Sequence, residues 1–177
     1  MRYEKILVGL GVALFVLGIS STAAGEEKAT AQEIVSKVQQ AANILAKSAT
    51  APAGEASLTQ FNQKDSPWAW KDTYIFVLDC SKNTIAAHPI KADLIGKDTT
   101  QMTDTKGNRF FGQLCAATQK PSGVWVEYWW PKPGEKEGSR KISYARQAGN
   151  TPFVVGAGIY DDKATIAELE KATSASK

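Results

Sequence analysis

The pattern of apolar and polar residues after position 29 first predicts a long amphipathic helix from Thr30 to Ala49. Its apolar positions recur at helical spacing, with polar residues between them: Ile34, Val38, Ala41, Ala42 and Leu45. Thr30 and Glu33 have the spacing of a capping box, in which each side chain accepts a hydrogen bond from a free backbone N–H at the helix start. Residues 52–54 contain Pro and Gly and predict the end of this element, and residues 57–62 predict a short helical turn.

The pattern then changes to short apolar runs separated by turn residues, which predicts strands. The predicted strands are at residues 74–78, 84–87, 124–130, 141–147 and 153–160. A crossover between the second and third strands contains a turn at 104–108 and a helix at 109–118. The residues of this helix that are predicted to face inward are Phe110, Phe111, Leu114 and Ala117. A last short helix is predicted through Leu169, capped by Asp161 or Asp162. The order of all these elements predicts an α+β fold with helices packed on a five-stranded antiparallel sheet.

The first 24 residues have the order of a secretory signal peptide. Charged residues come first, then the uncharged apolar run Ile6–Ile19, and then small residues up to Ala24. This run is shorter than the roughly 20 residues that span a membrane, so cleavage after Ala24 is favoured over a retained anchor. We therefore expect a signal peptide at 1–24, one domain at 25–172 and a flexible tail at 173–177. The expected location is periplasmic or secreted, with no membrane span after cleavage and no transmembrane output of its own.

Charge and cysteine content narrow the range of partners. Without the first 24 residues the chain carries 19 basic and 17 acidic residues, with no basic cluster, so nucleic acid is not an expected partner. The two cysteines, Cys80 and Cys115, would enter an oxidising compartment on export. They are either bonded to each other or two buried free thiols, and the sequence leaves both alternatives open.

The sequence holds no recognisable catalytic or cofactor motif. His88 is the single histidine, and no Gly-x-Ser-x-Gly, His-Glu-x-x-His or Cys-x-x-Cys-His pattern occurs. An enzyme that uses His88 as a base with Ser81 or Ser143 stays an alternative supported by residue type alone. The aspartates that are expected at turns and helix starts, rather than around calcium, are Asp93, Asp98 and Asp104. We predict no catalytic residue, metal or cofactor.

Four stretches in order resemble the single Cache family, and together they cover about residues 30 to 162. They are Pro67-Trp68 with residues 74–79; Ala87-His88-Pro89 with residues 94–98; residues 104–108 leading to Phe110; and residues 126–134 with 141–144 and 155–160. The resemblance implies an extracytoplasmic sensor with a long N-terminal helix and a PAS-like sheet. Such domains commonly bind organic acids or amino acids and sit on chemoreceptors and histidine kinases.

The chain departs from the family pattern in three ways. No transmembrane output module is expected in it, it carries the cysteine pair, and it has Thr151-Pro152-Phe153 where the family tends to place tryptophans. The first departure predicts that another chain reports the ligand, and the third predicts a pocket wall that differs in part from that of the family.

Strand alternation and the family motif together indicate a pocket. In the strand at 124–130, Val124, Val126, Tyr128 and Trp130 share one face, while Trp125, Glu127 and Trp129 share the other. Lys141 opens the next strand among apolar residues and matches the family motif, so it is the expected partner of a ligand carboxylate. Its alternative is a surface lysine paired with Glu127 across the strands.

The predicted ligand-binding residues are Trp68, Trp70, His88, Arg109, Tyr128, Trp130, Lys141 and Tyr144. For the tryptophans, the alternative is packing in the core. For Arg109, the alternative is an exposed position at the start of a helix, and for His88 it is the capping of a turn. In a regular strand Tyr144 points away from the Lys141 face, so only one of the two lines the pocket unless a bulge intervenes.

These observations predict an extracytoplasmic small-ligand-binding sensory domain, with a carboxylate favoured. The ligand is expected between the sheet and the crossover from His88 to Phe111. A membrane histidine kinase or chemoreceptor is the expected partner. The alternatives are a periplasmic interaction module that docks on a membrane sensor without a ligand, and an uncharacterised enzyme.

Overall fold

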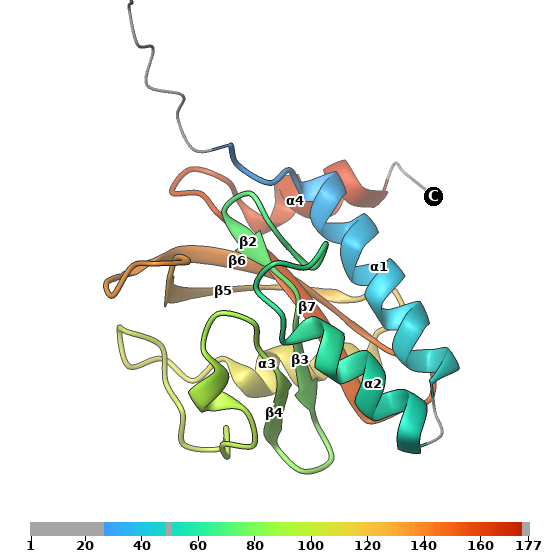
Figure 1. Cartoon of the computed structure of the whole chain (residues 1–177). Helices are drawn as coiled ribbons and strands as arrows, with labels where there is room; N and C mark the ends of the chain where they lie inside the picture. The colour runs from blue at the N-terminus through green and yellow to red at the C-terminus, as the bar shows by residue number, and fades with distance from the viewer. Residues whose placement is uncertain (1–26, 49–50, 175–177) are drawn as a thin grey trace, which may run out of the picture.

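The computed structural model describes residues 27–48 and 51–174 (Figure 1). The predicted signal peptide at 1–24 lies outside the described residues, as do the last three residues of the predicted tail. No helix in the described ranges has both the length and the apolar character needed to cross a bilayer.

A five-stranded antiparallel sheet is the centre of the fold and confirms the predicted α+β architecture. Its strands lie in the order β4-β3-β7-β6-β5. Their bounds are β3 Phe76–Asp79, β4 Thr84–Ala87, β5 Val124–Pro131, β6 Gly138–Gln147 and β7 Phe153–Tyr160. A separate two-stranded ribbon, β1 Ala69–Trp70 and β2 Thr73–Tyr74, precedes β3. The last strand in sequence, β7, therefore lies in the middle of the sheet, between β3 and β6.

One face of the sheet is covered by α1 (Ala31–Lys47), which packs on β7 and β6. Thr30 and Glu33 form the predicted capping box, with the Glu33 N–H donating to Thr30 Oγ1 at 3.2 Å and the Thr30 N–H to Glu33 Oε2 at 2.8 Å. The buried residues of α1 are the predicted set, Ile34, Val38, Ala41, Ala42 and Leu45. The helices α2 (Ala51–Phe61) and α4 (Ile166–Ser174) flank α1.

The crossover between β4 and β5 covers the opposite face (Figure 1). It contains two short 3₁₀ turns, η1 (Ala92–Leu94) and η2 (Ala116–Gln119), and the five-residue helix α3 (Phe111–Cys115). The residues predicted to face inward from this segment are all buried: Phe110, Phe111, Leu114 and Ala117. The sheet thus separates two apolar layers, a larger one under α1 and a more aromatic one under the crossover.

Several boundaries differ from the sequence prediction. The expected strand at 74–78 is split at Ile75, whose N–H donates to the Trp68 carbonyl at 2.7 Å. The expected helix at 109–118 is α3 followed by η2. The helix α2 begins at Ala51, since a proline in the first turn gives up no intrahelical hydrogen bond.

The last helix begins and ends later than predicted. Thr165 and Glu168 cap it, with the Glu168 N–H donating to Thr165 Oγ1 at 3.3 Å and the Thr165 N–H to Glu168 Oε2 at 3.0 Å. Asp161 instead accepts hydrogen bonds from the N–H groups of residues 163 and 164 in the preceding turn. The helix continues to Ser174.

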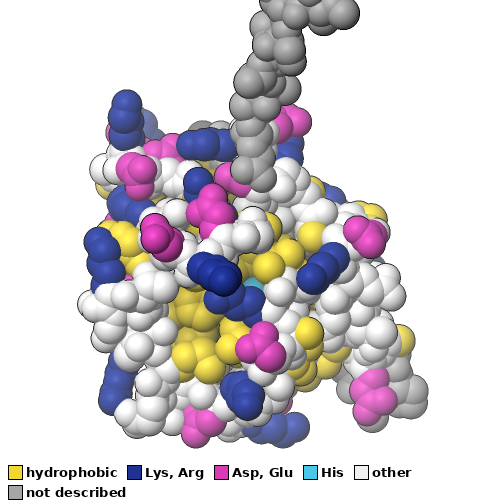
Figure 2. Space-filling view, turned by 60° about the vertical axis from the view of Figure 1, so that its left-hand side comes forward, with side chains coloured by type: hydrophobic (Ala, Val, Ile, Leu, Met, Phe, Trp, Pro, Cys, Tyr) yellow, Lys and Arg dark blue, Asp and Glu magenta, His cyan; other side chains and the backbone are white. Residues whose placement is uncertain are grey.

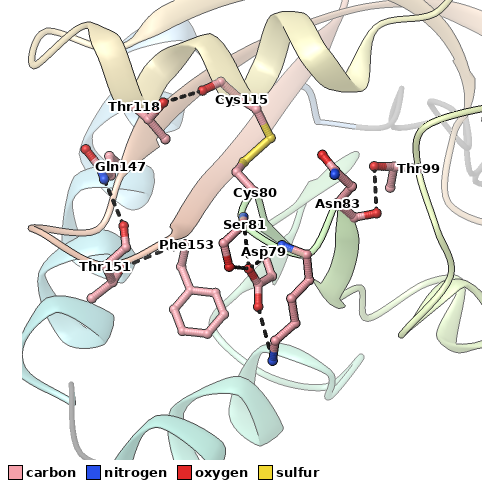
Figure 3. Close-up of a disulfide and its surroundings, with 11 residues drawn as sticks. Asp79, Cys80, Ser81, Asn83, Thr99, Cys115, Thr118, Gln147, Thr151 and Phe153 are labelled. Atoms are coloured by element: carbon pink, nitrogen blue, oxygen red, sulfur yellow. Dashed lines mark hydrogen bonds and ion pairs between the residues drawn. A yellow bond between two sulfur atoms is a disulfide. The ribbon is translucent and has the colours of Figure 1, made fainter.

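Cys80 and Cys115 form a disulfide, with their Cα atoms 5.8 Å apart (Figure 3). The bond joins the end of β3 to the end of α3, across a sequence separation of 35. A closed loop of this size restricts the unfolded chain strongly.

Replacing both cysteines by serine is expected to lower the free energy of unfolding by about 3–4 kcal/mol, because the unfolded chain regains the entropy of the open loop. Urea denaturation of the oxidised protein and the double variant checks this value. In the presence of a reductant the two proteins should unfold at the same urea concentration. A difference that persists after reduction would show that the serines, and not the lost bond, cause the change.

Candidate functional site

A small aromatic chamber lies between the sheet and the crossover. Its lining residues are Tyr74, Phe76, Leu78, Ile85, His88, Phe110, Phe111, Tyr128 and Trp130. The space open to the centre of a water-sized sphere is about 20 Å³, enough for about one water molecule. Figure 2 shows the cyan histidine at the edge of a yellow apolar area on the surface, with dark-blue basic side chains beside it.

The aromatic rings of the chamber pack closely on one another. Phe110 stacks on Tyr128 with ring centroids 4.0 Å apart and contacts Phe111 at 4.2 Å. Trp130 meets Phe110 edge-on at 5.6 Å. The chamber is therefore filled mainly by side chains of its own wall, and a ligand larger than water requires some of them to move.

Lys141 adjoins this chamber, with its Nζ over the rings of the lining residues Tyr74 and Phe76. It is on β6, opposite Tyr128 of β5 and Tyr160 of β7, and its side chain is fully buried. Its Nζ atom has no hydrogen-bond partner among the described residues. The ammonium group lies 4.1 Å from the centroid of the Tyr74 ring and 4.9 Å from that of Tyr160. Aromatic faces favour a cation, but they do not replace the hydrogen bonds that the group makes in water.

The room for this side chain comes from Gly158 on β7. A Cβ atom at that position would lie 2.8 Å from Lys141 Cε and 2.3 Å from Ser143 Oγ. The absence of a side chain on the central strand therefore lets the lysine cross it without a clash.

Burial lowers the pKa of Lys141 from 10.5 to about 7, with the negative charge of Asp72 acting in the opposite direction. Asp72 is itself buried, and its Oδ1 accepts a hydrogen bond of 2.9 Å from the Ala29 N–H. Near pH 7 the amine of Lys141 thus exists in both protonation states, and a bound anion would favour the protonated one.

His88 is buried at the end of β4 and is held in one orientation. Its backbone N–H donates to Asn62 Oδ1 at 2.8 Å, and its Nδ1 accepts from the Lys91 N–H at 3.1 Å. Burial, followed by the charges of Lys141 and Lys91, lowers the pKa of His88 to about 3. The ring is therefore neutral with the proton on Nε2, and it caps a turn while lining the chamber.

The hydroxyls of Tyr74, Tyr128 and Tyr160 are further polar groups around Lys141. Tyr128 and Ser143 share a hydrogen bond of 2.8 Å, and the Tyr160 hydroxyl donates to the Pro131 carbonyl at 2.8 Å. Burial raises the pKa values of Tyr74, Tyr128 and Tyr160, so all three stay protonated at neutral pH. Lys141 is then the one group near the chamber whose charge changes close to pH 7.

The comparison with known proteins decides the family. The sequence profile of the family described as dCache_2, Cache domain, matches residues 58–165. The chain belongs to the Cache domain family. This confirms the resemblance that the sequence motifs indicated.

Relatives of this Cache domain are sensory proteins. It is 30% identical over 91 residues to the methyl-accepting chemotaxis protein McpP of Pseudomonas putida, an alignment that covers 51% of this chain and 16% of that protein. A solved structure on "carboxylic acid recognition by a Cache chemosensory domain" has 25% identity and a TM-score of 0.62, covering 75% of this chain and 93% of that one. A "periplasmic sensor domain of chemotaxis protein" has 25% identity and a TM-score of 0.57, covering 72% and 88%.

Four of the eight predicted ligand-binding residues come together at the chamber of this Cache domain. His88, Tyr128 and Trp130 line it, and Lys141 adjoins it through Tyr74. The alternative ion pair of Lys141 with Glu127 is contradicted, since Glu127 pairs with Arg140. The register explains this, because Glu127 lies opposite Ile142, and the two side chains point to the α1 face.

The structure places the other four predicted residues elsewhere. Tyr144 points to the α1 side, where its hydroxyl donates to the Ser122 carbonyl at 2.6 Å, because it differs from Lys141 by an odd number of strand positions. Trp68 and Trp70 also pack on the α1 side, with Lys37 Nζ 5.5 Å from each ring centroid. Arg109 is exposed and bonds Gln101. None of the four lines the chamber.

Most of the chamber wall was not among the predicted site residues. The additional lining residues are Tyr74, Phe76, Leu78, Ile85, Phe110 and Phe111. Tyr74, Phe76 and Leu78 occupy alternate positions in the sequence. Phe110 and Phe111 were already expected to face inward. Combining these two signals would have placed them on one wall, but the sequence does not show that β3 and the crossover helix meet.

The residues weighed for catalysis and metal binding have other partners. Ser143 Oγ bonds Tyr128 and Ser81 Oγ donates to Asp79 Oδ1, and no hydrogen bond joins either serine to His88. Asp104 and Asp98 accept backbone N–H groups at turns, as expected. Across residues 27–48 and 51–174, no group of three or more His, Cys, Asp or Glu residues is placed to hold a metal.

Gly158→Ala is expected to lower the free energy of unfolding by about 1–3 kcal/mol, because the added methyl group overlaps with Ser143 and Lys141. Thermal unfolding checks this. Gly112→Ala is the matched control, since a Cβ atom there meets nothing within 4 Å and alanine favours the helix. Equal stability of the Gly158→Ala variant and the parent protein would mean that the lysine does not need this space.

Proposed function

We propose that this Cache domain is a periplasmic ligand-binding sensory domain that captures a small carboxylate through Lys141. The observation that carries the proposal is the fully buried Lys141 Nζ, which no residue in 27–48 or 51–174 supplies with a hydrogen bond and which lies beside an aromatic chamber. A buried charge is costly unless it is paired. A ligand carboxylate supplies the missing partner and forms a charge-assisted hydrogen bond worth about 1.5–3 kcal/mol.

The chamber restricts what such a ligand can be. Its wall is aromatic and aliphatic apart from His88 and the tyrosine hydroxyls, and it encloses about 20 Å³ as it stands. A carboxylate with a short apolar tail fits this composition, with the head toward Lys141 and the tail among the rings. The neutral His88 has an Nε2–H group that donates to no other described residue and is available to a second oxygen of the ligand.

The relatives support the same class of ligand and the same kind of partner. One structural neighbour is described by its recognition of carboxylic acids, and another as the periplasmic sensor domain of a chemotaxis protein. We therefore propose a membrane chemoreceptor or histidine kinase as the output partner of this chain. The family relatives are sensory domains, and neither Ser81 nor Ser143 is hydrogen-bonded to His88, so we propose no catalytic activity.

Calorimetric titration with acetate, propionate and glycine tests this function. Because burial lowers the pKa of Lys141 to about 7, carboxylate binding at pH 8.5 should take up about one proton. The proton uptake is measured as the difference in heat between two buffers of different ionisation enthalpy. The proton uptake should fall to about half a proton per bound ligand near pH 7. Absence of binding by every short carboxylate, or binding without proton uptake, would contradict the role of Lys141.

A further inference from the structure

The disulfide divides the chamber into two walls. We call Phe110 and Phe111 the tethered wall, because they lie in the crossover between β4 and Cys115. The remaining lining residues lie on or beside the strands and form the sheet wall: Tyr74, Phe76, Leu78, Ile85, His88, Tyr128 and Trp130. The bond therefore closes the loop that carries the whole tethered wall and fixes its far end to the sheet.

The sheet end of this tether is firmly held. Cys80 follows β3 directly, and its N–H donates to the Pro152 carbonyl at 3.0 Å. Asp79 Oδ1 accepts the N–H and the hydroxyl of Ser81 at 3.1 and 2.7 Å, which fixes the turn after Cys80 (Figure 3).

The other end is held less firmly. Cys115 is the last residue of α3, which has five residues and no side-chain cap at Phe110. A helix of this length is not stable without tertiary contacts. Its contacts with the rest of the domain come from Phe111 and Leu114, which are buried, and from the disulfide.

Ligand entry depends on this weakly held segment. The chamber admits about one water molecule while Phe110 stacks on Tyr128, so a carboxylate displaces part of the tethered wall. With the bond intact, Cys115 stays beside Cys80 and the wall closes again around a fixed point. With the bond broken, conformations in which α3 has left the sheet compete with the binding-competent conformation. The apparent affinity for the ligand then falls in proportion to the fraction of molecules that stay binding-competent.

We propose that the Cys80–Cys115 disulfide regulates ligand affinity by tethering one wall of the chamber to the other, so that its reduction weakens binding. This rests on the proposed function of the chamber. A dithiol reductant breaks the sulfur–sulfur bond by exchange, giving two cysteine thiols and the oxidised reductant. Both cysteines are partly exposed, so this exchange does not require unfolding.

Two measurements on the oxidised and reduced full chain test the tether. Hydrogen exchange should become faster after reduction in residues 105–119 by a larger factor than in α1 and β6, which are the internal controls for the loss of global stability caused by opening the loop. The dissociation constant for propionate should rise roughly tenfold. The Cys80→Ser/Cys115→Ser variant should match the reduced protein in both measurements, and reoxidation of the parent protein should restore both values.

The outcomes separate the two proposals. Exchange in residues 105–119 that rises after reduction by no larger factor than in α1 and β6 overturns the tether, whether or not a ligand binds. Equal propionate affinity in both redox states also overturns it. If the oxidised protein binds no carboxylate, the proposed function fails, while the exchange measurement still decides whether the disulfide controls the wall.

Discussion

Lys141→Met is expected to stabilise the ligand-free protein and to weaken carboxylate binding. Methionine fills a similar volume without a charge, and replacing buried charged groups by apolar ones often stabilises proteins by about 1–4 kcal/mol. The same change removes the charge-assisted hydrogen bond to the ligand, so the dissociation constant should rise roughly 10- to 100-fold. Thermal unfolding measures the first effect and calorimetric titration the second.

Lys106→Met is the matched control for this substitution. Lys106 also lies over an aromatic ring, with its Nζ 3.5 Å from the Trp129 centroid, but it is exposed and outside the chamber. Its replacement should change stability by no more than about 0.5 kcal/mol and leave binding unchanged. A destabilised Lys141→Met variant that binds carboxylates as the parent does would show that the lysine has a structural role.

The stability of the ligand-free protein should increase from pH 5 to pH 9. Lys141 has a pKa of about 7 in the folded protein and 10.5 as its ordinary value, so between these values the unfolded chain binds more protons. Stability therefore rises with pH in that range, by at most about 1.4 kcal/mol per pH unit. His88 has a pKa of about 3 in the folded protein and 6.5 as its ordinary value. It therefore also makes the stability rise with pH, between pH 3 and 6.5.

Urea unfolding at a series of pH values measures this dependence, and two variants assign it. Lys141→Met should flatten the curve between pH 7 and 9. It should also make the rise below pH 6.5 smaller, because the charge of Lys141 contributes to the lowered pKa of His88. His88→Asn should remove the rise below pH 6.5 and keep the rise between pH 7 and 9. A parent protein whose stability is already greatest at pH 7 and declines toward pH 9 would contradict the burial of an unpaired amine.

Local patterns were sufficient for the parts of the fold that depend on neighbours in sequence. The capping box and the apolar spacing of α1 specify that helix by themselves, and β4 and β7 have the predicted bounds. The start of β6 was missed because Gly138, Ser139 and Arg140 have a polar sequence. They become a strand because they continue the hairpin register opposite Trp129, Trp130 and Pro131.

The site could be predicted only in part, for a physical reason. Alternation placed Tyr128 and Trp130 on one face of β5, and it placed Lys141 and Tyr144 on opposite faces of β6; the register between the two strands comes from the structure. Trp68 and Trp70 carry no such signal, because β1 has two residues and its orientation depends on packing against Lys37 and Phe61. The chamber wall needs Phe110 to meet Tyr128, a contact that follows from the crossover path and not from local sequence.

Asp72 links the chamber to the place where the chain enters α1. Its Oδ1 accepts the Ala29 N–H, one residue before the Thr30 cap, and its charge favours the protonated amine of Lys141. An anion that pairs with that amine competes with Asp72 for the same positive charge. Under the proposed function, a bound carboxylate therefore weakens the attraction between Lys141 and the carboxylate that holds the beginning of the longest helix.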